Sequence, residues 1–595
     1  MGALLVAAML ALSLVAAGAT DAPAEQRKKQ KKRPYTLTLL HNNDGESQLV
    51  NLPGLEDFGG VARFSTKVRQ EKRSAKEGRN RGVLMVSSGD NFLAGPEFNA
   101  SIEDGVFYDA IALNRIRYDA IALGNHDFDF GPDVLADFIR DFEDPVPYLS
   151  ANLDFSGEPR LQRLVNRDRI RKFTIVKEDG QRFGIIGATT PLLPDISSPR
   201  NVEVNPDVAG VVQNQVRKLD RRGVNKIILI SHLQSIQEDL DLATELSGVD
   251  IMVAGGGDEL LANEDDLLVP GDGTEDAPIF GPYPVIATDS NGNEVPVVTT
   301  KGAYSYLGKL VVKFNRNGRV TQINDGSGPL RIAGGDNPDA VAEDNFLLQN
   351  VVQPVLDSIE ALASNVIAQS EVALDGQRAN IRTEETNEGN LIADALKWYA
   401  EQVAAEFGAP VPDIALQNGG GIRNDSLVGP GDITELDTFD MLPFPNFVAT
   451  VPDVPRETLK ELLENAVSNV ENVDGRFAQI SGFSFVWDPT AQARELDDEG
   501  NVVTPGERII DVTLEDGTVI VENGAVVAGD PLDVATVDFS ARGGDQWPWD
   551  GAGDFFVLGA SYQQALESYI IEELAGQITA ADYPEGGEGR ITTAP

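Results

Sequence analysis

The chain has 595 residues, too many for a single hydrophobic core, so we expect about two to four domains. Hydrophobic residues make up 42% and charged residues 24% of the sequence, which is typical of a globular rather than a disordered protein. The formal net charge of −46 argues against a protein that binds nucleic acid polymers, because an acidic surface repels phosphate. The chain has no cysteine, which excludes disulfides and cysteine catalysis.

The N-terminus indicates export from the cytoplasm. The apolar run ALLVAAMLALSLVAAGA ends in a small-residue pattern typical of a cleavage site, and we predict a signal peptide over residues 1–19. An N-terminal membrane anchor is the alternative, but the run is short for a spanning helix. We read residues 20–34, which carry six basic side chains between Arg27 and Arg33, as a disordered arm. We therefore predict a secreted or periplasmic protein with no stable membrane span after signal removal.

Short β-branched runs alternate with helical patterns from residue 35 to about residue 335, which predicts an α/β layer fold. The predicted strands are residues 35–40, 82–88, 119–124, 182–188, 226–232 and 249–255. Helical spacing from Phe346 predicts a connecting helix, within a linker region that we place at 336–365. A second, C-terminal domain then covers residues 366–595.

The C-terminal part has helix and hairpin patterns of its own. Apolar residues in TLKELLENAV recur at positions that form one buried stripe of a helix, which indicates core packing rather than function. Three Gly-containing segments between strand-like runs predict hairpin loops, at residues 289–294, 497–501 and 514–518.

Polar side chains gather where the N-terminal strands end. In open α/β folds, ligands bind at the carboxyl ends of the strands, so oxygen and nitrogen donors from five strands predict a metal site at one edge. A single Asp more often caps a helix, and a single His is more often structural. The prediction therefore depends on the occurrence of several such residues together at the ends of different strands. All three histidines of the chain, His41, His126 and His232, lie in these segments. The carboxylates and the asparagine there are Asp44, Glu46, Asp90, Asn125, Asp127, Asp129, Asp258 and Glu259.

The order Asp-x-Glu, Gly-Asp, Gly-Asn-His-Asp and a strand-end His resembles the calcineurin-like metallophosphoesterases. The motif LQNGGGIRND at 416–425 narrows the resemblance to the 5'-nucleotidase family. Three further segments support it, at residues 382–396, 440–448 and 539–547. The similarity extends from Tyr35 to about Ile571.

The resemblance implies a four-layer calcineurin-like phosphoesterase domain at 35–335, followed by a linker helix and a smaller α/β substrate-binding domain. It also implies an enzyme that hydrolyses nucleoside 5'-phosphates by attack of a metal-held hydroxide on phosphorus. The substrate would be a nucleotide or another phosphate ester. The oligomeric state stays open.

The resemblance also implies roles for individual residues of the N-terminal domain. Asp90 would bridge two divalent metal ions. Asp44 and Glu46 would hold one ion, while Asn125 and His232 would hold the other. His126 would face the phosphoryl group, oriented by Asp129, and would stabilise the charge that develops on phosphate and leaving group.

In the C-terminal domain, the resemblance implies a substrate site. Arg378, Arg382 and Arg423 resemble the anion-binding arginines of the family. Phe444 and Phe539 match the pair that sandwiches a nucleobase, with ordinary core packing as the alternative. The polar contacts to base or ribose would come from Asn418, Asn446 and Asp545.

The chain departs from its family at two metal-ligand positions. Glu46 stands where the family usually has His, and Gly256 stands where it has another His, although Asp258 could still bind an ion. We expect a working site that prefers hard ions (Mn²⁺, Mg²⁺ or Ca²⁺) in place of or alongside Zn²⁺. Two alternatives stay open. One is a broader alkaline phosphatase or cyclic-nucleotide phosphodiesterase, and the other is a non-catalytic nucleotide-binding relative.

Overall fold

The structure is a computed structural model that describes residues 34–142, 145–274, 277–496 and 502–594. The predicted signal peptide, nearly all of the basic arm and the hairpin loop at 497–501 lie outside the described residues. Within the described ranges, no helix is both long enough and apolar enough to span a bilayer.

All six predicted N-terminal strands are present. They are β1 (Tyr35–Asn42), β4 (Arg81–Ser87), β5 (Ala120–Ala122), β10 (Gln181–Thr189), β12 (Ile227–His232) and β13 (Ile251–Val253). β1, β4 and β5 are parallel neighbours in one sheet, and β10, β12 and β13 are parallel neighbours in another. The carboxyl ends of each parallel set therefore lie at one edge of its sheet. The five strand ends that the sequence analysis assigned to a single edge are divided between these two sheets.

The N-terminal half is a four-layer α/β structure. An eight-stranded sheet has the order β19-β18-β1-β4-β5-β6-β8, with β20 beside β18, and a six-stranded sheet has the order β16-β17-β13-β12-β10-β9. Besides the six predicted strands, the two sheets contain β6 (Tyr148–Leu149), β8 (Ile170–Arg171), β9 (Phe173–Glu178), β16 (Val285–Thr288), β17 (Glu294–Val298), β18 (Tyr306–Phe314), β19 (Val320–Ile323) and β20 (Gly328–Arg331). Leu37 and Leu39 of β1 share one buried cluster with Ile185 of β10 and Ile228 of β12, so the sheets pack face to face.

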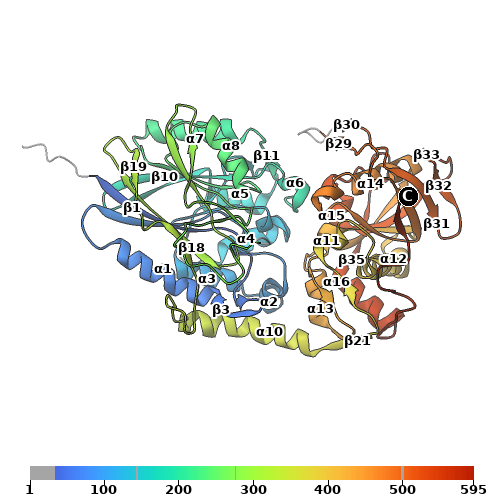
Figure 1. Ribbon diagram of the computed structural model, residues 1–595. Helices are drawn as coiled ribbons and strands as arrows, with labels where there is room; N and C mark the ends of the chain where they lie inside the picture. The colour runs from blue at the N-terminus through green and yellow to red at the C-terminus, as the bar shows by residue number, and fades with distance from the viewer. Residues whose placement is uncertain (1–33, 143–144, 275–276, 497–501, 595) are drawn as a thin grey trace, which may run out of the picture.

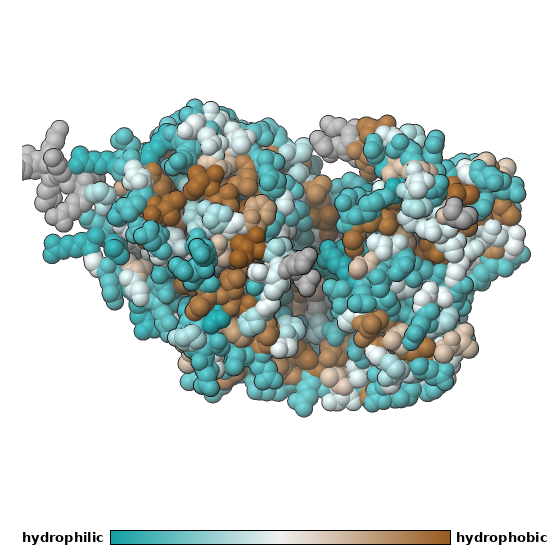
Figure 2. Space-filling model, viewed as in Figure 1, coloured by the Kyte–Doolittle hydropathy of each residue, from teal (hydrophilic) through white to brown (hydrophobic). Residues whose placement is uncertain are grey.

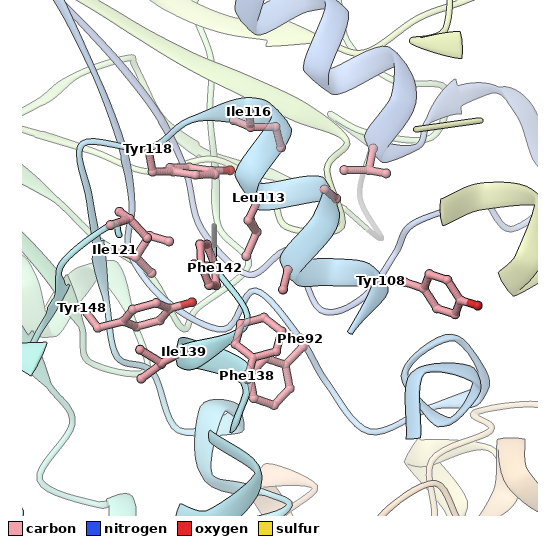
Figure 3. Close-up of a cluster of buried hydrophobic side chains, with 14 of the residues drawn as sticks. Phe92, Tyr108, Leu113, Ile116, Tyr118, Ile121, Phe138, Ile139, Phe142 and Tyr148 are labelled. Carbon is pink, nitrogen blue, oxygen red and sulfur yellow. The ribbon is translucent and has the colours of Figure 1, made fainter. Parts of the chain in front are cut away.

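Helices cover the outer face of each sheet. The helices α7 (Val208–Arg221) and α8 (Ile236–Glu245) add side chains to the buried cluster that includes the six-stranded sheet. On the opposite side, α1 (Val61–Ala75), α3 (Tyr108–Ile116) and α4 (Gly131–Arg140) pack on the eight-stranded sheet. Figure 3 shows the aromatic part of that second cluster, in which the rings of Phe92 and Phe138 lie 4.5 Å apart.

The predicted connecting helix is present in three consecutive segments. It comprises α9 (Asn345–Leu347), a π-helical turn over Leu348–Val352, and α10 (Gln353–Ser364). α10 contacts α2 (Pro96–Asp104) in the first half and α13 (Glu435–Met441) in the second, and it runs along the lower edge of both in Figure 1. The helix thus fixes the two halves side by side.

The C-terminal half contains two five-stranded sheets and a long helix. One sheet has the order β27-β23-β34-β26-β35 and the other β33-β32-β31-β28-β37. Their strands are β23 (Ile414–Asn418), β26 (Phe447–Val454), β27 (Ala478–Ser481), β28 (Phe483–Trp487), β31 (Ile509–Leu514), β32 (Val519–Glu522), β33 (Ala525–Val526), β34 (Leu532–Val537), β35 (Phe556–Ser561) and β37 (Ile591–Thr593). α12 (Asn387–Phe407) packs on the first sheet, and the predicted stripe helix is α14 (Arg456–Ala466), buried as expected. The hairpins predicted at 289–294 and 514–518 are present.

Candidate active site between the two halves

The loops that follow β1 and β4 are tied together at the strand ends. The backbone N–H of Asp44 donates to the Gly89 carbonyl at 3.1 Å, and the N–H of Glu46 donates to the Asp90 carbonyl at 2.9 Å. Asp44, Glu46 and Asp90 all have positive φ values, between 48° and 49°. Such a conformation is uncommon outside glycine, so the two loops hold strained backbone in order to present carboxylates together.

The structure brings three of the predicted metal ligands into one buried group. Ligand atoms of Asp44, Asp90 and His232 lie within 4.8 Å of one another. His232 Nε2 lies 2.8 Å from Asp90 Oδ2 and 3.0 Å from Asn125 Oδ1. His232 Nδ1 lies 2.7 Å from the Ser88 carbonyl and donates to it, which leaves Nε2 as the nitrogen that faces the group.

A small cavity of about 40 Å³ lies at this group. It is lined by Asp44, Glu46, Asp90, Asn125, His126, Gln234, Gly256 and Asp258. Burial and the charges of Asp258 and Asp44 together raise the pKa of Glu46 to about 8, although His126 acts in the opposite direction. Burial also raises the pKa of Asp44 to about 6. These carboxylates repel one another where they are buried, and a bound cation would relieve that repulsion.

The residues therefore fit divalent metal ions. Carboxylate and amide oxygens with one imidazole nitrogen are donors that hard and borderline cations accept. For His232, burial lowers the pKa, but the charge and hydrogen bond of Asp90 outweigh it and raise the pKa to about 10. A metal ion would take the place of that proton on Nε2.

His126 lies between the metal cavity and a larger cavity. Its Nδ1 lies 2.7 Å from Asp129 Oδ2, and its backbone N–H donates to Asp90 Oδ1 at 2.9 Å. Asp129 is held in turn by the Ser197 hydroxyl, which donates to Oδ1 at 2.8 Å. Burial lowers the pKa of His126, but Asp129 and Asp90 outweigh it and raise the pKa to about 9. The imidazolium thus favours contact with a phosphoryl oxygen.

Three other strand-end residues of the sequence analysis, His41, Asp127 and Glu259, have structural contacts, whereas Asp258 lies at the small cavity. His41 is buried with its Nε2 2.7 Å from the Tyr283 hydroxyl, and burial lowers its pKa to about 3. Glu259 accepts from the Ile236 N–H at 3.1 Å, at the start of α8. Asp127 accepts from the Gly124 N–H at 2.8 Å. Asp258 lines the small cavity, although its side chain is largely exposed.

A second cavity, of about 400 Å³, lies between the two halves, where Figure 2 shows a recess in the surface. Asn125, His126 and Asp129 line it from the first half. The predicted substrate residues on its other wall are Arg382, Asn418, Arg423, Phe444, Asn446, Phe539 and Asp545. Arg378 is exposed and does not line this cavity, although its charge and that of Arg423 interact.

Several contacts hold the C-terminal wall in place. Arg423 lies over the ring of Phe444, 5.5 Å from its centroid. A Cβ on Gly544 would lie 2.5 Å from the ring of Phe539, so that ring needs glycine beside it. Asn418 Nδ2 donates to Asp545 Oδ2 at 2.6 Å, and burial raises the pKa of Asp545 to about 6. The wall therefore presents aromatic faces beside fixed polar groups.

The side chains of these cavities that the sequence analysis missed include three charged residues and one glutamine. Asp195 lines the large cavity from α6 (Leu193–Ile196) and hydrogen-bonds to Gln546 across the boundary between the halves. Asp474 and Arg476 form an ion pair of 2.8 Å on the opposite wall. Gln234 lines both cavities. Its position two residues after His232 was the one available sequence signal.

Comparisons of the sequence and the structure with known proteins find 5'-nucleotidases and a related nucleotide phosphoesterase. A family model described as the 5'-nucleotidase C-terminal domain matches residues 366–551. The crystal structure of a 5'-nucleotidase precursor from Thermus thermophilus superposes with a TM-score of 0.70 and 32% identity, covering 94% of this chain and all of that one. The 5'-nucleotidase of Bos taurus is 30% identical over 80% of this chain and 79% of its own length. The Bacillus subtilis trifunctional nucleotide phosphoesterase YfkN is 29% identical, and this chain spans 32% of its length.

The fold, the carboxylate–histidine group and these relatives define a metallophosphoesterase, a hydrolase of phosphoric esters. Such enzymes use a dinuclear metal site, which agrees with the donors gathered around Asp90. The chain belongs to the 5'-nucleotidase family.

Proposed function

We propose that this protein hydrolyses nucleoside 5'-phosphates in the cleft between its two halves. The observation that carries the proposal is the position of His126, which lines both the small metal cavity and the large cavity. A phosphate ester that lies at His126 can therefore place its phosphoryl group at the metal ligands and its remaining part against the C-terminal wall. The names of the relatives, 5'-nucleotidases among them, agree with a nucleotide in that position.

The C-terminal wall supports a nucleotide rather than a small phosphate ester. Phe444 and Phe539 are half-buried and line the cavity, where they can stack on the two faces of a base. Asn418 and Asp545 offer hydrogen bonds to the base or ribose, with Asn446 nearby. We assign the anionic phosphate to the guanidinium groups of Arg382 and Arg423, which line the cavity, whereas Arg378 does not.

In this mechanism His126 stabilises charge on the phosphoryl group and the leaving oxygen. The hydrogen bond from Nδ1 to Asp129 fixes the ring, so that Nε2 is available to the substrate. The metal ions, when bound, supply Lewis-acid activation of the phosphoryl group and neutralise its charge. Asp44, Glu46, Asp90, Asn125, His232 and Asp258 would hold them.

We assign the site to hard ions such as Mn²⁺, Mg²⁺ or Ca²⁺, because Glu46 replaces an imidazole with a carboxylate. We also assign the protein to the exterior of the cytoplasm. This assignment depends on the N-terminal apolar run that ends at Ala19. N-terminal sequencing of the protein recovered from its native cells tests it, and a chain that retains Met1 contradicts export by cleavage.

The test of the function is phosphate release from AMP by chelated protein that is re-supplied with Mn²⁺, Mg²⁺, Ca²⁺ or Zn²⁺ in turn. We expect hydrolysis with a hard ion, and a higher kcat/KM for AMP than for p-nitrophenyl phosphate. Equal kcat/KM values for the two substrates would favour a broader phosphatase. No hydrolysis of either substrate with any ion would exclude catalysis and favour a nucleotide-binding protein.

A further inference from the structure

Gln234 lies directly beside the ligands of one metal position. Its side-chain Nε2 donates to Asn125 Oδ1 at 2.8 Å, and that same oxygen lies 3.0 Å from His232 Nε2. Gln234 is half-buried and lines both the small cavity and the large one. Its backbone φ angle is +89°, a conformation that residues other than glycine rarely adopt. The loop after β12 therefore holds strained backbone where it presents this amide.

Gln234 lies next to position 256, where this chain lacks a ligand side chain. Gly256 stands where the family usually has a histidine, and it lies against the same residues. A Cβ on Gly256 would lie 2.9 Å from His232 Nε2 and 3.2 Å from the backbone nitrogen of Gln234. A side chain at position 256 therefore has no room beside His232 in this loop arrangement, whereas the amide of Gln234 already faces Asn125.

We propose that Gln234 is a metal ligand of this chain, and that its amide oxygen serves the ion held by Asp90, Asn125 and His232. This proposal rests on the same site as the proposed function. An amide can exchange its nitrogen and oxygen by rotation about its last torsion, so the donor seen next to Asn125 can become an oxygen ligand. An uncharged oxygen in place of an imidazole still provides a ligand atom for a hard cation, but it suits Zn²⁺ less well.

The test is calorimetric titration of chelated protein with Mn²⁺ in the absence of nucleotide. We expect two ions per chain for the wild type. Gln234→Gly removes the amide at a position whose φ suits glycine, so the fold should persist. The weaker of the two dissociation constants should rise by about 10- to 100-fold in this variant, the range seen when metal-site partners are removed. The control is Gln237→Ala, which changes an exposed glutamine of α8 and should match the wild type.

Gln234→Glu separates a ligand from a hydrogen-bond donor. A carboxylate keeps an oxygen for the ion but cannot donate to Asn125, so it should bind the second ion at least as tightly as the wild type. Binding as weak as that of Gln234→Gly would overturn the proposal. So would wild-type affinity in Gln234→Gly. In crystals of the Ca²⁺-loaded protein, Gln234 Oε1 should lie about 2.3–2.6 Å from the ion, and a distance beyond about 3.5 Å would also overturn it.

These outcomes are independent of catalysis. A protein that binds two ions but hydrolyses no nucleotide would contradict the proposed function alone. A protein that hydrolyses AMP while Gln234→Gly binds both ions normally would contradict the role of Gln234 alone.

Discussion

His126 and Asp129 form a pair in which Nδ1 of the imidazole lies 2.7 Å from a carboxylate oxygen. Asp129 is nearly fully buried and is itself held by Ser197, so the ring has one preferred orientation. The pair lies next to the metal ligands, but its hydrogen bond occupies Nδ1 and leaves the other ring nitrogen free for the substrate. The hydrogen bond to Asp129 therefore distinguishes His126, which we expect to act on the substrate, from the neighbouring residues that we expect to hold metal ions.

We expect His126→Ala to reduce kcat for AMP by about 10²- to 10⁴-fold, since a positioned group that stabilises transition-state charge contributes this much. Metal content, measured by elemental analysis, should stay near that of the wild type. Asp129→Asn should lower kcat less, because the ring remains but is less firmly oriented. A His126→Ala protein that loses metal would show that His126 is a ligand instead.

The aromatic pair of the C-terminal wall gives a prediction about substrate choice. Changing both Phe444 and Phe539 to Ala removes base stacking, which is worth about 1–3 kcal/mol per base. We therefore expect kcat/KM for AMP to fall by about 10- to 100-fold, while p-nitrophenyl phosphate, which has no base, should be hydrolysed nearly as before.

The matched control is Phe447→Ala, which removes an exposed phenylalanine close to Phe444 in the chain. It should leave both substrates unaffected. Equal losses for AMP and p-nitrophenyl phosphate in the double variant would show that the two rings pack the domain rather than hold a base.

Glu46 gives a prediction about metal choice. Its carboxylate lines the small cavity at a position where the family usually has an imidazole. We expect Glu46→His to raise the ratio of Zn²⁺-supported to Mn²⁺-supported activity by about tenfold or more, because imidazole nitrogen suits zinc. Chelated protein loaded with each ion in turn measures this ratio.

The control is Gln48→His, which adds an imidazole in the same loop but outside the small cavity. Its ratio should equal that of the wild type. An unchanged ratio in Glu46→His would mean that position 46 does not select the metal.

The strands could be predicted from the sequence for a physical reason, because parallel strands buried on both faces read as continuous apolar runs. Their carboxyl ends lie at one edge of a sheet, so the sequence also indicates which polar residues gather at strand ends. Asp90 follows β4 of one sheet and His232 ends β12 of the other, so only the packing of the two sheets brings these two residues together. The role of Gln234 could not be read in this way. It depends on the positive φ of Gln234 and on the close packing of Gly256 against His232, and no local sequence pattern reveals either.

The packing of the two halves against each other could not be predicted from the sequence either. Asp195 and Gln546 meet only because α6 and the 3-10 turn Gly544–Gln546 are in contact across the boundary. Arg378 carries the same side chain as Arg382 four residues later, yet Arg378 is exposed and Arg382 is buried on the cavity wall. Residue type predicts the chemistry of such positions, whereas burial is set by the tertiary structure.

Glu388, at the start of α12, gives a prediction about stability and pH. It is fully buried, and burial raises the pKa of its carboxyl from 4.5 to about 8, against a hydrogen bond of 3.0 Å from Asn424. Its Oε1 and the Oδ1 of Asn424 have no partner among the described residues, which agrees with a protonated acid. Between pH 4.5 and 8 the folded protein thus keeps a proton that the unfolded chain has lost.

The free energy of unfolding should therefore fall as pH rises through this window, with a contribution from Glu388 of up to about 1.4 kcal/mol per pH unit. Glu388→Gln is neutral at every pH, so the variant should gain stability relative to the wild type from about pH 5 to about pH 8. Urea unfolding at several pH values measures the difference. Glu384→Gln, which changes an exposed carboxylate four residues earlier, should follow the wild-type curve. Parallel curves for Glu388→Gln and the wild type would mean that Glu388 is ionised in the folded protein.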